Sequence, residues 1–387
     1  MQPVNPALAR YGTTIFTVMS ALATEHGAIN LGQGFPDEDG PETLRRRAAQ
    51  AMLEGPNQYP PMRGLPDLRR AVAAHQGRRY ALDADWQTEV LVTSGATEAL
   101  AACFLGLLQP GDEVVLLEPL YDSYLPMIEC AGAVAKLVRL EPPDWALPLD
   151  ALAAAFSART RLLVLNSPLN PAGKVFGAAE LSSIAGLLQA HDAYAVCDEV
   201  YEHLLFDGVA HVPLATLPGM RERCLRIGSA GKSFSLTGWK VGWVTGPAGL
   251  IDAAARAHQF LTFTTPPGLQ LAVAEGLRLE DAYFHGMAQA LERKRDRLAA
   301  GLGAAGFSVL PTSGTFFMVA GYDRLATGED DEAFCRRLTV RAGVAAIPVS
   351  AFYRSDPPQG FVRFCFCKRD EVLDQAISRL TEHFVSA

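Results

Sequence analysis

The sequence contains no long apolar run and no excess of positive charge. None of its hydrophobic stretches reaches the roughly 18 residues that a membrane-spanning helix needs. The formal net charge is −8, so we expect neither a nucleic-acid partner nor a membrane surface, which would require a basic patch. Residues 1–5 lack the basic start and the apolar run of a secretory signal. These absences argue against a secreted, membrane-spanning or nucleic-acid-binding protein, and the cysteine usage described next favours a cytoplasmic one.

Cysteine is scarce and scattered, with seven residues and no C-x-x-C spacing. This usage predicts reduced core thiols rather than a disulfide framework. Cys365 and Cys367 alternate with Phe364 and Phe366, which is the pattern of a strand. No further cysteine or histidine stands at ligand spacing beside them, so we expect no metal site.

Composition and periodicity together predict the fold class. Hydrophobic residues make up 49% and charged residues 20% of the 387 residues, a balance and a length that favour a globular protein of two domains. Short apolar runs alternate with helical periodicity, for instance at residues 97–108 and 178–190. The expected strands are residues 89–93, 113–117, 134–138, 161–166, 194–198, 224–228 and 241–245. Alternation of this kind predicts a doubly wound, mainly parallel α/β sheet.

After about residue 290 the pattern changes. A charged helix over residues 291–301 precedes strand-like segments at 307–310, 315–319 and 361–367 and a final helix. These elements predict a smaller α+β domain. We therefore expect a large domain of residues 45–285 and a small domain of residues 1–44 and 286–387.

The expected strand at 224–228 leads into a segment that contains Ser229, Gly231 and Lys232. Ligands of open α/β sheets bind at the carboxyl ends of the strands. A nucleotide P-loop would need glycine five residues before Gly231, where Arg226 stands. A lysine beside small residues can instead approach a planar cofactor and form a Schiff base, with its pKa lowered by burial. Taken alone, the segment would fit a surface lysine in a turn better than a lysine that binds a cofactor.

Neighbouring strand ends offer partners for such a cofactor. The strand at 194–198 ends in Asp198, and a buried carboxylate needs a cation such as a protonated pyridinium nitrogen; a helix cap is the alternative. Tyr201 follows within reach of the ring's phenolic oxygen. Asn170 lies between Pro168 and Pro171, which stiffen its loop and allow it to donate a hydrogen bond to the same oxygen.

A third strand end resembles a phosphate site. The strand at 89–93 leads through Ser94 and Gly95 into a helix, and small residues there allow backbone N–H groups to hold an anion. Ser229 and Lys240 are placed to complete that cup. A serine–glycine turn before a helix is commonplace, so this element is weak by itself.

Together these segments resemble the class I aminotransferases of pyridoxal phosphate (PLP) fold type I. The family's lysine motif is S-x-x-K with a cation eight residues later, here Ser229, Lys232 and Lys240. More narrowly, residues 30–37, 57–61 and 362–366 are similar to kynurenine aminotransferases (glutamine transaminase K), bacterial methionine aminotransferases and some succinyldiaminopimelate aminotransferases. The resemblance runs from Tyr11 to the C-terminus. The sequence departs from the family at Leu169, where the family usually has His or Asn. This change would make the entrance to the site less polar than in the family.

The resemblance implies a set of roles for individual residues. Lys232 would carry PLP and then move a proton at the substrate's Cα. The ring would be held by Asp198, Tyr201, Asn170 and Tyr121. The phosphate would be held by Gly95, Ala96, Thr97, Ser229 and Lys240, with Tyr59 reaching over from a second subunit of a homodimer. The substrate's α-carboxylate would pair with Arg363, and Gly34, Asn170 and Phe16 would complete the substrate site.

The implied function is transfer of an amino group between an L-amino acid and a 2-oxo acid. We expect donors with neutral side chains (methionine, glutamine, aromatic or kynurenine-like), because residues 260–267, expected at the side-chain pocket, carry no charge. One alternative is an N-succinyl-LL-diaminopimelate aminotransferase of lysine biosynthesis, which residues 34–41 also resemble. Another is a cysteine-conjugate β-lyase. A PLP-binding transcription regulator is disfavoured, because residues 1–30 are too short and insufficiently basic for a DNA-binding domain.

Overall fold

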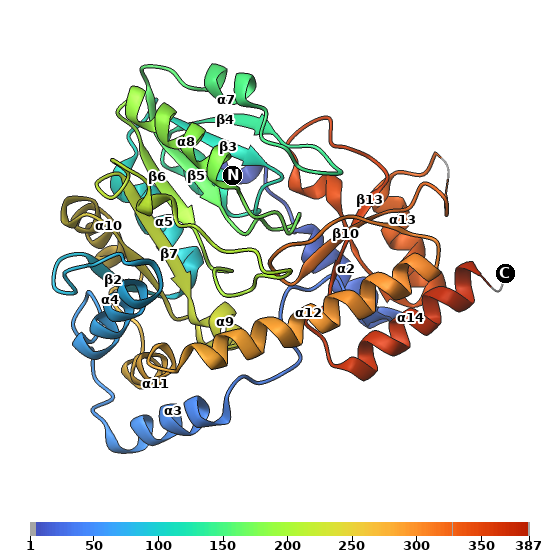
Figure 1. Ribbon diagram of the computed structural model, residues 1–387, viewed down its shortest axis with the longest axis horizontal. Coiled ribbons are helices and arrows are strands. Elements are labelled where there is room, and N and C mark those ends of the chain that lie inside the picture. The colour runs from blue at the N-terminus through green and yellow to red at the C-terminus, as the bar shows by residue number, and fades with distance from the viewer. Residues whose placement is uncertain (1–4, 327, 386–387) are drawn as a thin grey trace.

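A seven-stranded sheet forms the larger part of the molecule (Figure 1). The computed structural model describes residues 5–326 and 328–385. The strands lie in the order β2-β8-β7-β6-β5-β3-β4, and β8 runs antiparallel to both of its neighbours. Their bounds are β2 Val90–Thr93, β3 Glu113–Glu118, β4 Val134–Arg139, β5 Thr160–Asn166, β6 Tyr194–Asp198, β7 Cys224–Ser229 and β8 Gly242–Thr245. The expected α/β fold class is confirmed, and each expected strand agrees to within one residue at either end.

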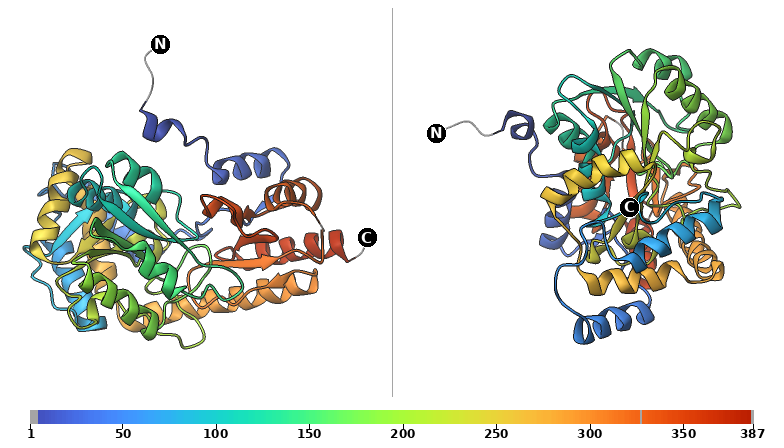
Figure 2. Two further views of the ribbon diagram at one scale, coloured as in Figure 1. Left: turned by 90° about the horizontal axis from the view of Figure 1, so that it is seen from above. Right: turned by 90° about the vertical axis from the view of Figure 1, so that its left-hand side faces the viewer.

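Helices cover both faces of this sheet, which explains its apolar strands. Every residue of β2, β3, β7 and β8 is buried, as expected when helices pack on both sides of parallel strands. In Figures 1 and 2, α8 (Ala178–Ala190) lies on one face, and α5 (Gly95–Leu107) with α10 (Ala248–Leu261) lies on the other. Connections through such helices bring the carboxyl ends of β5, β6 and β7 to one edge.

A smaller antiparallel sheet has the order β12-β13-β10-β9. Its strands are β9 Ser308–Val309, β10 Phe317–Gly321, β12 Ile347–Pro348 and β13 Phe361–Cys365. The strand expected at 315–319 begins two residues later, because Thr315 has a left-handed φ of 71° and its hydroxyl accepts a hydrogen bond from the Phe317 amide. A parallel pair, β1 Ile29–Asn30 with β11 Val344–Ala345, joins the N-terminal segment to this region.

One long helix, α12 (Asp281–Ala304), runs from the larger sheet to the smaller one, where α14 (Asp370–Phe384) packs beside it (Figure 1). At the opposite end α3 (Glu42–Glu54) and α4 (Pro66–Tyr80) pack against α11 (Pro267–Leu277). The expected domain boundaries at residues 45 and 286 fall inside α3 and α12. The remaining helices are α1 Pro6–Ala9, α2 Ile15–Glu25, α6 Tyr124–Cys130, α7 Leu149–Ala155, α9 Ala230–Ser233 and α13 Asp331–Arg337.

Two clusters of buried apolar side chains fill the interior. The second cluster includes Leu44, Val72 and Trp243 and takes in Ala230 and Phe234, which flank Lys232. Packing therefore fixes the short helix α9 that presents this lysine. Within residues 5–326 and 328–385, no helix combines the length and the apolar character that crossing a membrane requires.

Candidate active site

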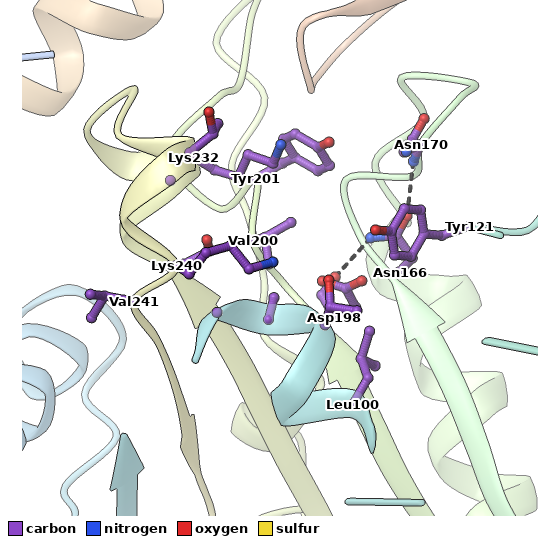
Figure 3. A pocket seen from close by; sticks show the side chains of 16 residues that line it. Leu100, Tyr121, Asn166, Asn170, Asp198, Val200, Tyr201, Lys232, Lys240 and Val241 are labelled. Carbon is purple, nitrogen blue, oxygen red and sulfur yellow. Dashed lines mark hydrogen bonds between the residues drawn. The ribbon is translucent and has the colours of Figure 1, made fainter. Parts of the chain in front are cut away.

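The carboxyl ends of three adjacent strands meet at one cavity. β5, β6 and β7 end in Asn166, Asp198 and Ser229, and these residues border a cavity of about 190 Å³ (Figure 3). The N-terminal turn of α5 closes the cavity from another side. Its lining is Gly95, Ala96, Thr97, Leu100, Tyr121, Asn166, Asn170, Asp198, Val200, Tyr201, Ser229, Gly231, Lys232, Thr237, Lys240 and Val241. The topology thus gathers most of the expected site residues around one space.

Lys232 presents a buried amine at this cavity. Its Nζ lies 3.5 Å from the carbonyl oxygen of Gly34, 5.6 Å from the ring centre of Tyr201 and 5.0 Å from that of Phe316. Burial lowers the pKa of the Lys232 ammonium, because an uncompensated charge is costly among aromatic rings. A larger fraction of neutral amine favours attack on a carbonyl group.

Asp198 presents a carboxylate that is only half satisfied. Its Oδ2 accepts a hydrogen bond of 2.6 Å from the Tyr124 hydroxyl, while Oδ1 is buried and has no hydrogen-bond partner in the described part of the chain. Burial raises the pKa of this carboxyl group, although the Tyr124 bond and the charge of Lys232 oppose the rise. A cationic N–H group placed against Oδ1 would remove this cost.

The opposite end of the cavity suits an anion. Gly95 begins α5 with a left-handed φ of 80°, and a side chain at this position would lie 3.4 Å from Nζ of Lys240. The absence of a side chain leaves room beside the first amides of the helix, whose dipole favours negative charge. Ser229 borders the same end.

A chain of hydrogen bonds links Asp198 to Arg363. Nδ2 of Asn166 donates to the backbone carbonyl oxygen of Asp198 at 2.9 Å, and the backbone N–H of Asn170 donates to Oδ1 of Asn166 at 2.9 Å (Figure 3). Nη1 of Arg363 then donates to Oδ1 of Asn170, also at 2.9 Å. Asp198 and Arg363 are therefore held in one network.

Arg363 is a buried cation that still has donors to offer. Its Nη2 donates to the carbonyl oxygen of Gly32 at 2.7 Å, and its guanidinium lies 3.8 Å from the ring centre of Phe317 and 5.2 Å from that of Phe16. Nε is buried without a hydrogen-bond partner among the described residues. Burial lowers the pKa of Arg363 to about 10. The arrangement favours binding of an anion against the free donors.

A comparison with protein families decides the identity. Residues 26–380 match the model described as aminotransferase class I and II. The chain belongs to this family. Because the family and its fold depend on PLP, this aminotransferase is a PLP-dependent enzyme, as the sequence predicts.

Individual relatives cover nearly the whole aminotransferase. It is 50% identical to a probable N-succinyldiaminopimelate aminotransferase of Mycobacterium tuberculosis and 41% identical to the methionine aminotransferase of Escherichia coli, each over 97% of both chains. It is 39% identical to the human kynurenine–oxoglutarate transaminase 1 over 92% of both chains. A solved N-succinyldiaminopimelate aminotransferase from M. tuberculosis superposes with a TM-score of 0.95 at 50% identity, covering 98% of this chain and 99% of the other.

The polar groups of the cavity fit PLP in kind. Oδ1 of Asp198, which has no partner among the described residues, borders the space where a pyridinium N–H could lie, and an amine of lowered pKa lines the same cavity. At the far end, Lys240 and the first turn of α5 suit a phosphate. These features are the ones that a PLP site requires of its protein.

Tyr59 lies apart from this cavity in the aminotransferase chain. Its side chain is 84% exposed and packs edge-on against Phe263 at 5.5 Å between ring centres. Phe260, three residues before Phe263 in the sequence, is 85% exposed. His258, in contrast, is buried and hydrogen-bonded to Glu98 and to the carbonyl oxygen of Met62. This histidine is therefore not free to pair with a substrate.

Tyr124 and Asn166 belong to the site, although the sequence analysis did not single them out. Asn166 ends its strand as Asp198 does, so its position was a usable signal. Tyr124 begins α6, three residues after Tyr121, and the two rings are in edge contact at 5.6 Å.

A buried ionic network lies behind Asp198. Arg226 on β7 donates to Oε2 of Glu199 at 2.7 Å and to Oε2 of Glu202 at 3.2 Å. Nε2 of His211 lies 3.0 Å from the same Glu199 oxygen, and Nε2 of His203 lies 3.8 Å from Oε1 of Glu202. Although burial opposes ionisation, Arg226 and His211 hold the pKa of Glu199 below its usual range. Residues 198–203 thus send Asp198 and Tyr201 toward the cavity and the two glutamates into this network.

Proposed function

We propose that this aminotransferase exchanges amino groups between 2-oxo acids and L-amino acids with neutral side chains, such as methionine, glutamine, phenylalanine and kynurenine. The aromatic surroundings of Arg363 carry the proposal: its guanidinium lies within about 5 Å of the ring centres of Phe16, Phe317 and Phe352. Among the described residues that line the cavity, the cations are Lys232 and Lys240. A distal carboxylate would therefore meet apolar surface rather than a partner of opposite charge.

The cofactor and its holders are assigned on the same basis. When bound, PLP supplies the electron sink that makes the donor's Cα–H acidic. Lys232 holds the cofactor and moves the proton at Cα, since its amine is buried and its pKa is lowered. Asp198 keeps the ring nitrogen protonated through its free Oδ1. Tyr201 and Asn170 bind the phenolic oxygen, and Tyr121 stacks on the ring.

The phosphate and the substrate occupy opposite ends in this proposal. The phosphate lies at the first turn of α5, bound by Gly95, Ala96, Thr97, Ser229 and Lys240. The donor's α-carboxylate lies against Arg363, with Asn170, Phe16 and the backbone of Gly34 around it. The observation in favour is that Arg363 retains a buried N–H without a partner in the described chain.

A homodimer completes the site in this proposal. Tyr59 and Phe260 are large aromatic residues that are more than four-fifths exposed, which favours burial against a second subunit. Mixing Lys232→Ala subunits with Tyr59→Ala subunits should restore one site per mixed dimer, because each subunit supplies the residue that the other lacks. Full activity in a chain shown to be monomeric would contradict the shared site. We also propose a cytoplasmic location, since all seven cysteines are free thiols.

N-succinyl-LL-diaminopimelate is the second candidate donor. The observation in its favour is the 50% identity to the probable N-succinyldiaminopimelate aminotransferase of M. tuberculosis. This donor carries additional carboxylates, so its use would require cations outside the cavity lining described above, for example from a second subunit. The place of the enzyme in lysine biosynthesis would follow if this donor were preferred.

A panel of donors with 2-oxoglutarate tests the proposal. Methionine, glutamine and phenylalanine should exceed aspartate by about tenfold or more in kcat/KM, which corresponds to about 1.4 kcal/mol of transition-state binding. N-succinyl-LL-diaminopimelate is measured in the same panel. A strong preference for either acidic donor over methionine would overturn the neutral-donor proposal and leave the aminotransferase activity itself intact.

A further inference from the structure

Two thiols lie in contact at the end of β13. The Sγ atoms of Cys365 and Cys367 are 3.2 Å apart, and both side chains are buried. Side chains two residues apart on a strand project from the same face, so Cys365 follows Arg363 on the face that carries the substrate cation. Neither thiol has a role in the transamination proposed above.

A second cavity gives access to this pair. It has a volume of about 490 Å³ and is lined by residues 36–41, by α12 and by Lys232. Cys367 and Phe316 form part of the same lining. A small molecule in this cavity therefore meets the sulfur of Cys367 close to the amine of Lys232, whereas Cys365 lies behind it.

The two thiols differ in their tendency to ionise. Burial would raise the pKa of Cys365, but the hydrogen bond from Cys367 and the charge of Lys368 lower it to about 7. Burial and the same hydrogen bond raise the pKa of Cys367 well above its usual value. The pair can therefore share a single proton at neutral pH, which provides the thiolate that oxidation needs.

We propose that Cys365 and Cys367 form an oxidisable dithiol, which hydrogen peroxide converts to a disulfide, and that this modification weakens donor binding. The shared proton passes to Cys365, and the thiolate sulfur of Cys367, which borders the cavity, attacks one peroxide oxygen. The O–O bond breaks, which leaves a sulfenic acid on Cys367 and a hydroxide that takes up a proton from solvent as the first water. The sulfur of Cys365 then attacks that of Cys367 and the S–O bond breaks, and the departing hydroxide takes the Cys365 proton as a second water. Two electrons pass from the sulfurs to the peroxide.

The dithiol is fastened to the segment that surrounds the substrate. The Cys365 amide donates to the carbonyl oxygen of Leu31 at 2.7 Å, and the Asp37 amide donates to the carbonyl oxygen of Cys367 at 3.4 Å. Between these anchors lie Gly32, whose carbonyl binds Arg363, and Gly34, whose carbonyl faces Lys232. Disulfide formation brings the sulfurs from 3.2 Å to about 2.05 Å. A bridge between residues only two apart closes a small ring, so it strains the backbone of residues 365–367, which holds both anchors.

The chemical test uses a Cys130→Ser variant, because Cys130 is exposed and would react first. After treatment with peroxide and alkylation under denaturing conditions, peptide mapping should show residues 365 and 367 unalkylated and lighter by two hydrogens. Cys197 and Cys224, on adjacent strands of the core, serve as an internal control and should be alkylated. Cys365→Ser and Cys367→Ser in the same background should form no disulfide. Full alkylation of residues 365 and 367 after peroxide would overturn the proposal.

The functional test rests on the proposed function and is read separately. In the Cys130→Ser enzyme loaded with PLP, oxidation should lower the donor kcat/KM about fivefold, the equivalent of about 1 kcal/mol. The cofactor absorbance should persist, and dithiothreitol should restore the rate. A mapped disulfide with unchanged donor kcat/KM would refute the effect on binding. If reduced enzyme transaminated none of the donors, the proposed function would fail, while the mapped disulfide would still support the dithiol.

Discussion

Replacing Arg363 with alanine should lower the kcat/KM of every α-amino acid donor and leave cofactor binding intact. A guanidinium has five N–H donors. In the structure one bond goes to Asn170, one goes to Gly32, and the Nε–H is without a partner among the described residues. The unused donors are those that a carboxylate can accept as a fork. Losing a hydrogen bond to a charged group costs about 1.5–3 kcal/mol, so we expect a fall of roughly 10- to 150-fold.

The assay follows the cofactor's absorbance change in the amino-donor half-reaction, which reports on donor binding and proton transfer without the acceptor. Arg363→Lys is the matched variant: it keeps the charge but cannot form the fork, so its loss should be intermediate. An amine that lacks the α-carboxylate should be affected far less by either change. Thermal unfolding checks the fold, because alanine also leaves the Asn170 and Gly32 oxygens unpaired. A folded Arg363→Ala enzyme with wild-type donor kcat/KM would refute this assignment.

Three further outcomes follow from the buried groups. Lys232→Ala should lose both borohydride-trapped cofactor and turnover, and near wild-type exchange would exclude the lysine. Asp198→Asn should weaken PLP binding and slow proton removal, whereas Tyr124→Phe, which removes only the bond to Oδ2, should have a smaller effect; equilibrium dialysis and the half-reaction compare them. Burial lowers the pKa of His203 from 6.5 to about 3, so the unfolded chain binds more protons between these values. The free energy of unfolding in urea should therefore fall as the pH drops through this range, and less steeply in His203→Gln.

Residues at strand ends were the most predictable part of the site. Asp198, Asn170 and Lys232 stand out because each is a polar or charged residue at the end of a buried apolar strand or within four residues of it. Parallel strands bring such ends together. Arg363 is conspicuous for a related reason, since a charged residue in an apolar strand needs a partner. The bounds of the large sheet followed from the same alternation of strands and helices.

Other parts depend on contacts between elements that are distant in the chain. Tyr124 meets Asp198 across 74 positions of sequence, and no local pattern reports such a meeting. The ionic network is hidden for the same reason, because it needs Arg226 from β7 against glutamates that follow β6. Thr315 was expected to begin the strand-like segment 315–319, but its left-handed backbone and a side-chain hydrogen bond give a turn instead.

The side chains of residues 198–203 are divided between the cavity and the ionic network, and this division restricts how the enzyme can be redesigned. A single residue inserted between Val200 and Tyr201 would shift the tyrosine into the position of Glu202, toward Arg226, and would leave the inserted residue facing the cavity. A hexapeptide with other side chains at positions 199 and 202 would need matching changes at Arg226 on β7 and at its partner Gln76 on α4. Libraries aimed at new donors should therefore vary the aromatic residues around Arg363 and leave residues 198–203 in register.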